Sequence, residues 1–364
     1  MNILQFADYR ASYEGNIIYS MKALATEVKR GGGELVYLFP AETATQPWAK
    51  ALAARGEAVY FLCGGVVGNI RLVGRIIKKH HISIIHTHFS LFKEDFILKA
   101  AGLLSGSKPV YVRHMHMLYH SKQSLFLEEI KRRVSNADAE IACSEATKEA
   151  MLDAGLPARN LSVVVNALDF SRLDAYEAFS PDVPERTGVI LMFGYNYRVK
   201  GVDLAIQAVK KLNEAGVPVC LMVVAASNKE GIVDEIVREH GSMPAFVRMV
   251  PAREDVGAYY HAAHLFLSAS REESFCYAVR EAAYLQCATV VSDIPAHRMT
   301  ESDIRFRSGD AADLADKLQF ALNKQNMAGR LEKQKQYVTE HNSVSAWCAE
   351  IMKIYAAVLR KKED

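Results

Sequence analysis

The sequence predicts an α/β protein built from two doubly wound domains, each with a parallel sheet between layers of helices. Three observations predict this fold class. Segments typical of short buried strands alternate with amphipathic helical segments along the whole chain. The length of 364 residues suits two domains of ordinary size. Two prolines and several turn-forming residues predict a linker at 179–187, between the two series.

In the first half of the chain, we expect a strand wherever a short apolar run is bounded by turn-forming residues. These strands are expected at Asn2–Phe6, Glu34–Phe39, Glu57–Leu62, Ile82–His86, Val110–Arg113, Glu140–Cys143 and Leu161–Val165. Between them, apolar residues recur with helical spacing over Ile17–Arg30, Asn69–His80 and Asp95–Leu104. We therefore expect a first domain over residues 1–178.

The second series follows the same rule. Its strands are expected at Val189–Phe193, Val219–Ala225, Phe246–Val250, Leu265–Ser268 and Thr289–Ser292. Helical spacing predicts helices over Phe275–Gln286, Ala311–Leu322 and Ser345–Arg360. The second domain is expected over residues 187–344.

Composition excludes several classes of protein. Half the residues are hydrophobic, which is enough for two cores, and the net charge of +2 gives no electrostatic basis for nucleic-acid binding. The six cysteines form no Cys-x-x-Cys pair and no cluster at zinc spacing. The chain opens with a strand instead of a signal peptide, and no apolar run reaches the roughly 18 residues of a membrane span. We expect a reduced, cytoplasmic protein.

Two glutamates eight positions apart, Glu273 and Glu281, are the most informative pair. Glu273 is expected in the turn after the strand Leu265–Ser268, and Glu281 about two turns into the next helix. A ligand at the carboxyl end of this strand would meet the first carboxylate and then the free N–H groups that open the helix. The second carboxylate could reach a neighbouring pair of hydroxyls. This order suits a sugar, a diphosphate and a ribose in series.

The pattern of a glutamate, seven residues and a second glutamate resembles that of the retaining glycosyltransferases of family 4. These enzymes have the GT-B fold, in which two Rossmann-like domains face a cleft. The resemblance implies that Glu273 contacts hydroxyls of the donor sugar and that Glu281 holds the nucleotide ribose. It also implies that Ser274, Phe275 and Cys276 bind the donor. The helix at 345–364 is expected to pack back on the first domain, as the last helix does in that family.

A second motif, Gly194-x5-Lys200-Gly201, follows the first strand of the second domain. Glycine permits a tight turn close to a ligand, and a fixed cation there would offset the charge of a leaving diphosphate. The spacing resembles the diphosphate-clamping element of family 4. Tyr195 stands where the family usually has arginine, which makes Arg198 the candidate for the missing charge. The alternative is that Arg198 and Lys200 are ordinary solvated residues at a helix start.

Two pairs of histidines end strands of the first domain. Strand alternation puts His114 and His116 on one face, and the resemblance implies that one of them lies near the reacting sugar. The choice between them stays open. His86 and His88 resemble a His-x-His of the family and are expected to hydrogen-bond loops. We expect no metal, because there is no Asp-x-Asp motif at a strand end.

The loop before the first helix contains Gly15. In family 4 this loop holds small residues that approach the donor phosphates or the acceptor, which implies the same role for Gly15. The alternative is a plain helix N-terminus with Asn16 as its cap. Ser144 is expected to cap a later helix.

The resemblance implies a retaining, metal-independent transferase without a cofactor. It would move a sugar from a nucleotide-sugar donor, most simply a UDP-sugar, to a glycan or lipid-linked acceptor in cell-surface polysaccharide synthesis. Two alternatives stay open. One is a sugar-nucleotide epimerase of the same fold. The other is a non-catalytic partner subunit that binds a nucleotide or glycan, which the altered positions Tyr195, Ala167 and Ala225–Ser227 favour.

Contact with a membrane is a further expectation. Basic residues gather on one expected helix, and a second basic cluster follows; they are Arg71, Arg75, Lys78, Lys79 and Lys131–Arg133. Such clusters would suit peripheral binding to the inner, anionic face of a membrane. The alternative is an ordinary amphipathic helix that packs on a sheet.

Overall fold

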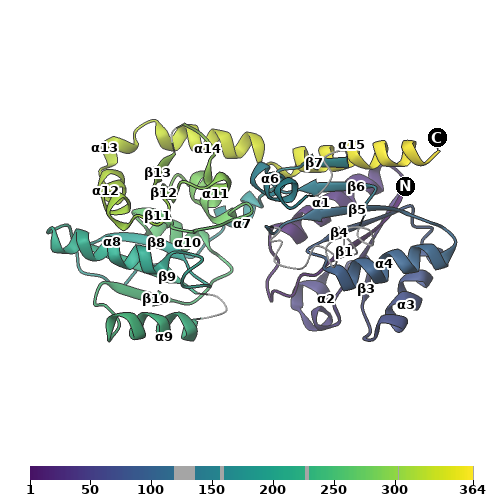
Figure 1. Cartoon of the computed structure of the whole chain (residues 1–364), viewed down its shortest axis with the longest axis horizontal. Coiled ribbons are helices and arrows are strands. Elements are labelled where there is room, and N and C mark those ends of the chain that lie inside the picture. Colours follow the sequence, from purple (N-terminus) through teal and green to yellow (C-terminus); the bar gives the residue numbers. More distant parts are fainter. Residues whose placement is uncertain (119–135, 156–159, 226–228, 302, 364) are drawn as a thin grey trace. The chain divides into compact units, whose positions relative to one another are not determined.

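The computed structural model describes residues 1–118, 136–155, 160–225, 229–301 and 303–363. The chain divides into two compact units (Figure 1). Unit 1 is Met1–Ala167 with Asn342–Asp364, and unit 2 is Leu168–His341. Each unit has a parallel sheet with helices against it, of seven strands in unit 1 and six in unit 2. The predicted fold class, two doubly wound α/β domains, is confirmed.

The sheet of unit 1 runs in the order β3-β2-β1-β4-β5-β6-β7. Its strands are β1 (Asn2–Ala7), β2 (Glu34–Phe39), β3 (Ala58–Phe61), β4 (Ile84–His88), β5 (Val110–Met115), β6 (Ala139–Ala142) and β7 (Leu161–Val163). Its helices are α1 (Asn16–Arg30), η1 (Ala41–Thr45), α2 (Pro47–Ala54), α3 (Val66–Lys79), α4 (Phe92–Ser105), α6 (Glu145–Asp153) and α15 (Val344–Glu363). The strand order reverses beside β1, which is the usual position of ligand sites in such folds.

Helices cover both faces of this sheet. Val110 and Val112 of β5 belong to the core cluster that holds Trp347 and Tyr355 of α15. Tyr111 points to the opposite face and belongs to the cluster with α3 and α4. The last helix therefore completes the core of unit 1.

The α4 side of the sheet contains a buried network of charges. Arg113 pairs with Glu140 at 2.6 Å and with Asp95 at 3.2 Å, and the Tyr111 hydroxyl donates to Asp95 at 2.6 Å. Strand alternation separates this network from the histidines, which lie on the α15 side.

The sheet of unit 2 runs in the order β10-β9-β8-β11-β12-β13. Its strands are β8 (Gly188–Phe193), β9 (Val219–Val224), β10 (Val247–Val250), β11 (Leu265–Ser268), β12 (Ala288–Ser292) and β13 (Ile304–Phe306). Its helices are α7 (Phe170–Asp174), α8 (Val202–Glu214), α9 (Lys229–His240), α10 (Gly257–Ala262), α11 (Tyr277–Tyr284), η3 (Pro295–His297), α12 (Ala311–Leu322), α13 (Lys324–Met327) and α14 (Arg330–His341). One core cluster of this unit contains residues of α8 and α12, and a second contains residues of α10, α11 and α14.

The chain passes from unit 1 to unit 2 between Ala167 and Leu168. Leu168 and Leu173 are buried in a core of unit 2, and Phe179 lies edge-on against Tyr259 with 4.9 Å between the ring centroids. The residues before β8 are therefore packed on unit 2.

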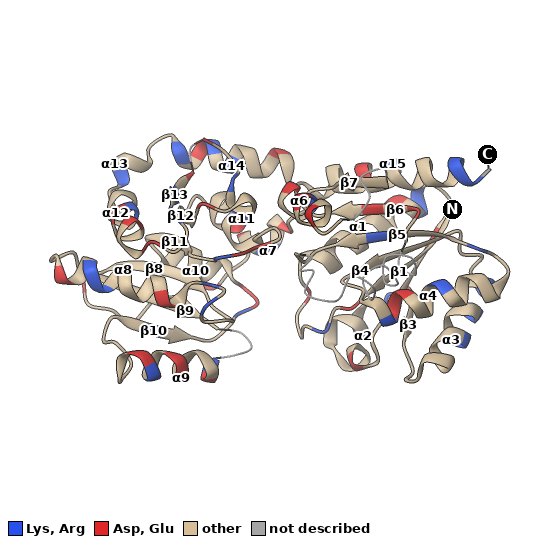
Figure 2. Ribbon diagram, viewed as in Figure 1, with Lys and Arg blue, Asp and Glu red and all other residues tan. Residues whose placement is uncertain are grey.

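The basic helix α3 carries Lys and Arg but neither Asp nor Glu (Figure 2). Its apolar residues Val73, Ile76 and Ile77 are buried in the core of unit 1, and its basic side chains are exposed. The second basic cluster, Lys131–Arg133, lies outside the described residues. None of the described helices has the length and hydropathy of a membrane span.

Candidate functional site

The carboxyl ends of the adjacent strands β8 and β11 bring Lys200 and Glu273 together in unit 2. The Lys200 ammonium pairs with Oε1 of Glu273, and the Ser270 hydroxyl donates to the same oxygen at 2.9 Å. Each side chain of the ion pair is only 12% exposed. The two motifs that the sequence singled out separately therefore meet in one place.

Lys200 is held in its charged form. Burial opposes the charge, but the Glu273 carboxylate outweighs it, and the pKa of Lys200 is raised above its ordinary value. The ammonium also lies 4.5 Å from the centroid of the Tyr195 ring, a cation–π contact. Tyr195 thus contacts the lysine from the position where the family usually has arginine.

Glu281 lies in α11 and is only 5% exposed. Its Oε1 accepts from Nη2 of Arg172 at 2.5 Å, and its Oε2 accepts from the Tyr260 hydroxyl at 3.1 Å. Burial and the neighbouring carboxylate raise the pKa of Tyr260 well above its ordinary value, so the phenol remains a donor. Sequence reasoning missed both partners, because each is distant in the chain.

The helix that carries Glu281 begins later than predicted. It starts at Tyr277 instead of Phe275, so Glu281 is just over one turn into it and not two. The delay comes from Cys276, whose φ of 61° is left-handed and cannot continue into the helix. The N-terminus of this helix carries a partial positive charge, which favours an anion there.

A buried arginine fixes the loop that leads into α11. Arg280 donates through Nη1 to the carbonyl oxygen of Phe275, to that of Cys276 at 3.3 Å and to that of Ala296 at 3.3 Å. Its guanidinium lies 4.0 Å from the centroid of the Phe275 ring. Ser274, which is half-buried, precedes this clamped segment. No local sequence pattern distinguishes Arg280, since a basic residue on a helix is ordinarily solvated.

The loop between β8 and α8 positions Lys200 through its glycines. Gly201 has φ of 67°, and a Cβ there would lie 2.1 Å from the carbonyl oxygen of Ala269. Gly194 follows β8 directly, and a Cβ there would lie 3.1 Å from methyl groups of Val202 and Val223. Gly201 therefore lets the loop approach the chain just after β11, and Gly194 lets it pack against α8 and β9.

Arg198 is directed to other partners. Its guanidinium pairs with Asp203 at 2.7 Å and with Glu239, and its side chain is 57% exposed. Arg271 also pairs with Asp203, at 2.8 Å. The hydrogen bonds of Arg198 to protein groups therefore join α8 and α9 and do not include Glu273.

The candidate histidines lie in unit 1. His114 is in β5 and His116 follows that strand; both are buried, and their ring centroids are 4.2 Å apart at an interplanar angle of 25°. They share one face, as alternation predicts. His86 and His88 are in β4 and fully buried; His88 bonds His116 in the segment after β5, as a loop contact would, whereas His86 bonds Tyr355 of α15.

The loop with Gly15 also departs from the expectation in one respect. Gly15 is the N-cap of α1 and Asn16 is its first residue, so the alternative in which Asn16 caps the helix is wrong. The predicted cap at Ser144 is confirmed, because its hydroxyl accepts from the Thr147 N–H at 3.0 Å.

Two groups of side chains in the described part of the chain have the spacing of metal ligands. One is Glu273, Cys276 and His297, and the other is His86, His88 and His114. In the first group, Glu273 holds Lys200, while His297 bonds Ser268 at 3.0 Å and Ser292 at 3.1 Å. Burial raises the pKa of the Cys276 thiol to about 12, which disfavours the thiolate that a metal needs.

Comparisons with known proteins bear on both units. A family described as "Glycosyltransferase Family 4" matches residues 24–172, and one described as "Glycosyl transferases group 1" matches residues 187–324. The chain is similar to a phosphatidylinositol N-acetylglucosaminyltransferase subunit of Arabidopsis thaliana, at 26% identity over 63% of this chain and 52% of that protein. For the protein of the same name from Homo sapiens the identity is 28%, over 59% of this chain and 44% of that protein. The chain thus spans about half the length of these curated relatives.

Solved structures of similar fold cover nearly the whole chain. A glycosyltransferase from Rickettsia africae ESF-5 has a TM-score of 0.80 and 16% identity, over 98% of both chains. Anabaena HepE in complex with UDP and glucose has a TM-score of 0.76 and 18% identity, over 98% of this chain and 100% of that one. At such identities the likeness supports the fold.

Proposed function

Because the chain belongs to the family 4 glycosyltransferases of group 1, we propose that it transfers a sugar from a UDP-sugar to a glycan or lipid-linked acceptor with retention of configuration. The observation that carries the proposal is the Lys200–Glu273 pair beside the N-terminus of α11 in unit 2. A cation, a carboxylate and the positive end of a helix are groups that suit a nucleotide-sugar.

The diphosphate would be held by Lys200 and by the first N–H groups of α11. Lys200 stays protonated, and a positive helix end favours the same ligand. When the sugar leaves, negative charge grows on the diphosphate, and a cation already in place stabilises that charge without reorganisation. In the free protein, Glu273 holds the ammonium in position.

Glu273 and Glu281 would orient the two ends of the donor. Glu273 would accept hydrogen bonds from sugar hydroxyls, and Glu281 from the hydroxyls of the ribose. Arg172 and Tyr260 fix the rotamer of Glu281, which reduces the entropy that nucleotide binding must overcome.

His116 is our candidate for stabilising the positive charge that develops at the anomeric carbon. Burial lowers the pKa of His116 to about 3, so its imidazole is neutral and does not repel that charge. His114 is the alternative, and we expect no divalent ion to take part in the transfer itself.

The choice of UDP and of the acceptor rests on the relatives. HepE was solved with UDP and glucose, and the curated relatives are named for N-acetylglucosamine transfer to phosphatidylinositol. UDP-N-acetylglucosamine is therefore the first donor to try, and a lipid-linked acceptor the first acceptor class. The exposed basic side of α3 would suit contact with an anionic membrane surface.

Calorimetry with UDP, GDP and ADP tests the donor site. We expect one nucleotide, UDP, to bind with a micromolar Kd, and Lys200→Met and Glu281→Gln to weaken it by about tenfold or more. Lys210→Met is the matched control, because Lys210 is an exposed lysine of the adjoining α8. Binding that is absent, or equal in all four proteins, would remove the donor site from unit 2.

Turnover of UDP-sugars then distinguishes the functions. Transfer to an added acceptor in the presence of a chelator supports the proposal, including its metal independence. Conversion of the UDP-sugar to free UDP and an epimerised sugar without an acceptor would indicate an epimerase. Tight UDP binding with no turnover would indicate a partner subunit that only binds the nucleotide.

A further inference from the structure

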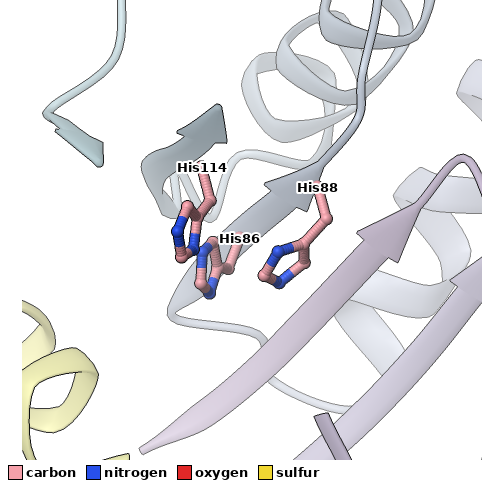
Figure 3. A group of neighbouring side chains, drawn as sticks. All are labelled: His86, His88 and His114. Atoms are coloured by element: carbon pink, nitrogen blue, oxygen red, sulfur yellow. The ribbon is translucent and has the colours of Figure 1, made fainter. Parts of the chain in front are cut away.

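Imidazole rings gather on one face of the sheet of unit 1. His86 and His88 lie two residues apart in β4, and His114 is the register partner of His88 in β5. All three point to the same side, where their rings converge (Figure 3). The ring centroids are 4.2 Å apart for His86 and His88, and 5.3 Å apart for His88 and His114.

The polar atoms of this cluster are incompletely satisfied. Nδ1 of His86 lies 2.5 Å from the Tyr355 hydroxyl and 3.5 Å from Nε2 of Gln5. Nδ1 of His88 lies 3.0 Å from Nε2 of His116. Within the described residues, Nε2 of His86, Nε2 of His88 and both ring nitrogens of His114 have no hydrogen-bond partner. An unpaired buried polar group ordinarily costs about 1–3 kcal/mol, and a bound ion would satisfy several of these atoms at once.

Ring nitrogens that have no hydrogen-bond partner among the described residues are available as metal ligands. A neutral imidazole keeps one lone pair on nitrogen. The Nδ1 contacts of His86 and His88 leave that lone pair on Nε2 when Nδ1 carries the proton. A hydrogen bond from the other ring nitrogen is typical of histidine ligands.

We infer that His86, His88 and His114 bind a divalent transition-metal ion such as Zn²⁺, through Nε2 of His86, Nε2 of His88 and one ring nitrogen of His114. The candidate ligand atoms all lie within 4.8 Å of one another. Around a tetrahedral zinc ion with bonds of about 2.0–2.1 Å, two nitrogens lie roughly 3.3 Å apart. Small side-chain rotations therefore close the site. Three protein ligands leave the fourth position for a solvent molecule.

The last helix covers the histidine cluster. Trp347 lies against His114 with 6.2 Å between the ring centroids, and the Tyr355 hydroxyl forms a hydrogen bond with His86. Both residues belong to α15, which therefore covers the cluster. The charged residues of β5 and β6, Arg113 and Glu140, lie on the other face. The metal would join β4 to β5 under the last helix. The site shares no residue with the nucleotide-binding groups proposed in unit 2, but its ligand His88 bonds His116, the candidate for the charge at the anomeric carbon.

The first test uses the whole chain, free of any histidine tag and stripped with EDTA. Titration with Co²⁺ should give one ion per chain by elemental analysis, the absorption of a tetrahedral cobalt site, and quenching of Trp347, which lies beside His114. Zn²⁺ should displace the cobalt, restore the fluorescence and raise Tm by several degrees at about 100 times its Kd. A chain that takes up no stoichiometric Co²⁺ or Zn²⁺ would overturn the inference.

Variants then locate the ion. His86→Gln and His114→Gln should each weaken binding by about a hundredfold or more, and Tyr355→Phe by roughly tenfold through its contact with a ligand. His88→Cys keeps a ligand and should add a sulfur-to-cobalt charge-transfer absorption. That variant reports a positive signal even if the glutamine variants do not fold.

Two controls separate this site from others. His240→Ala removes an exposed histidine of α9, and Cys276→Ser removes the thiol of the second ligand-like group. Both should bind the ion as the wild type does. Full binding in His86→Gln and His114→Gln, or loss of binding in Cys276→Ser, would put the metal elsewhere.

Discussion

Arg172 holds Glu281 across 109 positions of sequence, with 2.5 Å between Nη2 and Oε1. The arginine belongs to α7, the first helix of unit 2, and the glutamate to α11. The side chain of Glu281 is 7% exposed, so the pair is largely screened from solvent. The residue proposed to hold the ribose is therefore positioned by the segment that enters unit 2.

Arg172→Met is expected to act on both stability and binding. It leaves a buried carboxylate without its cation, which should lower the free energy of unfolding by about 2–4 kcal/mol and weaken UDP binding by roughly tenfold. Urea unfolding and calorimetry measure the two effects. The double variant Arg172→Met/Glu281→Met should recover part of the stability but none of the binding. Equal stability of Arg172→Met and wild type would contradict the role of the pair.

Gly201→Ala is expected to destabilise unit 2 strongly. The new Cβ would meet the Ala269 carbonyl oxygen at 2.1 Å, in addition to the strain of φ at 67°. Gly216→Ala is the matched control, because its φ is 80° but nothing lies within 4 Å of an added Cβ. We expect about 1 kcal/mol for the control and at least about 3 kcal/mol for Gly201→Ala, measured by urea unfolding. Similar losses would mean that backbone strain alone matters at Gly201.

Lys200→Met and Arg198→Met are expected to differ in turnover. Loss of the buried Lys200 should lower kcat by about 10²–10³-fold with the donor chosen by calorimetry, because its charge stabilises the leaving diphosphate. Arg198 is exposed and already paired with Asp203 and Glu239, so its loss should cost only a few-fold. Steady-state kinetics decide between them. A larger effect at Arg198 would restore it as the main cation of the site.

His297 should make unit 2 less stable at acid pH. Burial lowers its pKa to about 4, whereas an unfolded histidine has a pKa near 6.5. Between these values the unfolded state binds the proton and the folded state does not, so the free energy of unfolding falls as pH falls. From pH 7.5 to 5 the loss from this one group is roughly 2 kcal/mol.

Amide exchange of β11 and β12 followed by mass spectrometry measures this loss within unit 2. His297→Asn is less stable at neutral pH, because its contacts to Ser268 and Ser292 change. Its stability should nevertheless depend less on pH than that of the wild type. Parallel pH profiles for the two proteins would show that His297 is not the group responsible.

The elements that sequence reasoning placed well are those with a strong local pattern. The strand Leu265–Ser268 and the helix Ala311–Leu322 have the predicted bounds, because apolar spacing alone determines them. The short strand Ile304–Phe306 was not predicted, because three residues are too few to show the alternation of a strand.

The contacts of the candidate site also differ in whether the sequence could predict them. The meeting of Lys200 and Glu273 follows from their places at the ends of strands, so it was predictable. The contacts of Glu281 with Arg172 and Tyr260 depend on how separate helices pack, and no local pattern contains that information. The burial of His86 likewise depends on a tyrosine 269 positions further along the chain.

The place of α15 has a consequence for synthesis on the ribosome. Unit 2 ends at His341, whereas unit 1 needs Trp347, Ile351 and Tyr355 to cover one face of its sheet. The segment that is translated second can therefore finish folding first, while part of one apolar face of the first-translated sheet stays uncovered until α15 emerges. Chaperones that shield apolar surface should accordingly engage the nascent chain over residues 1–167, and release should follow emergence of α15.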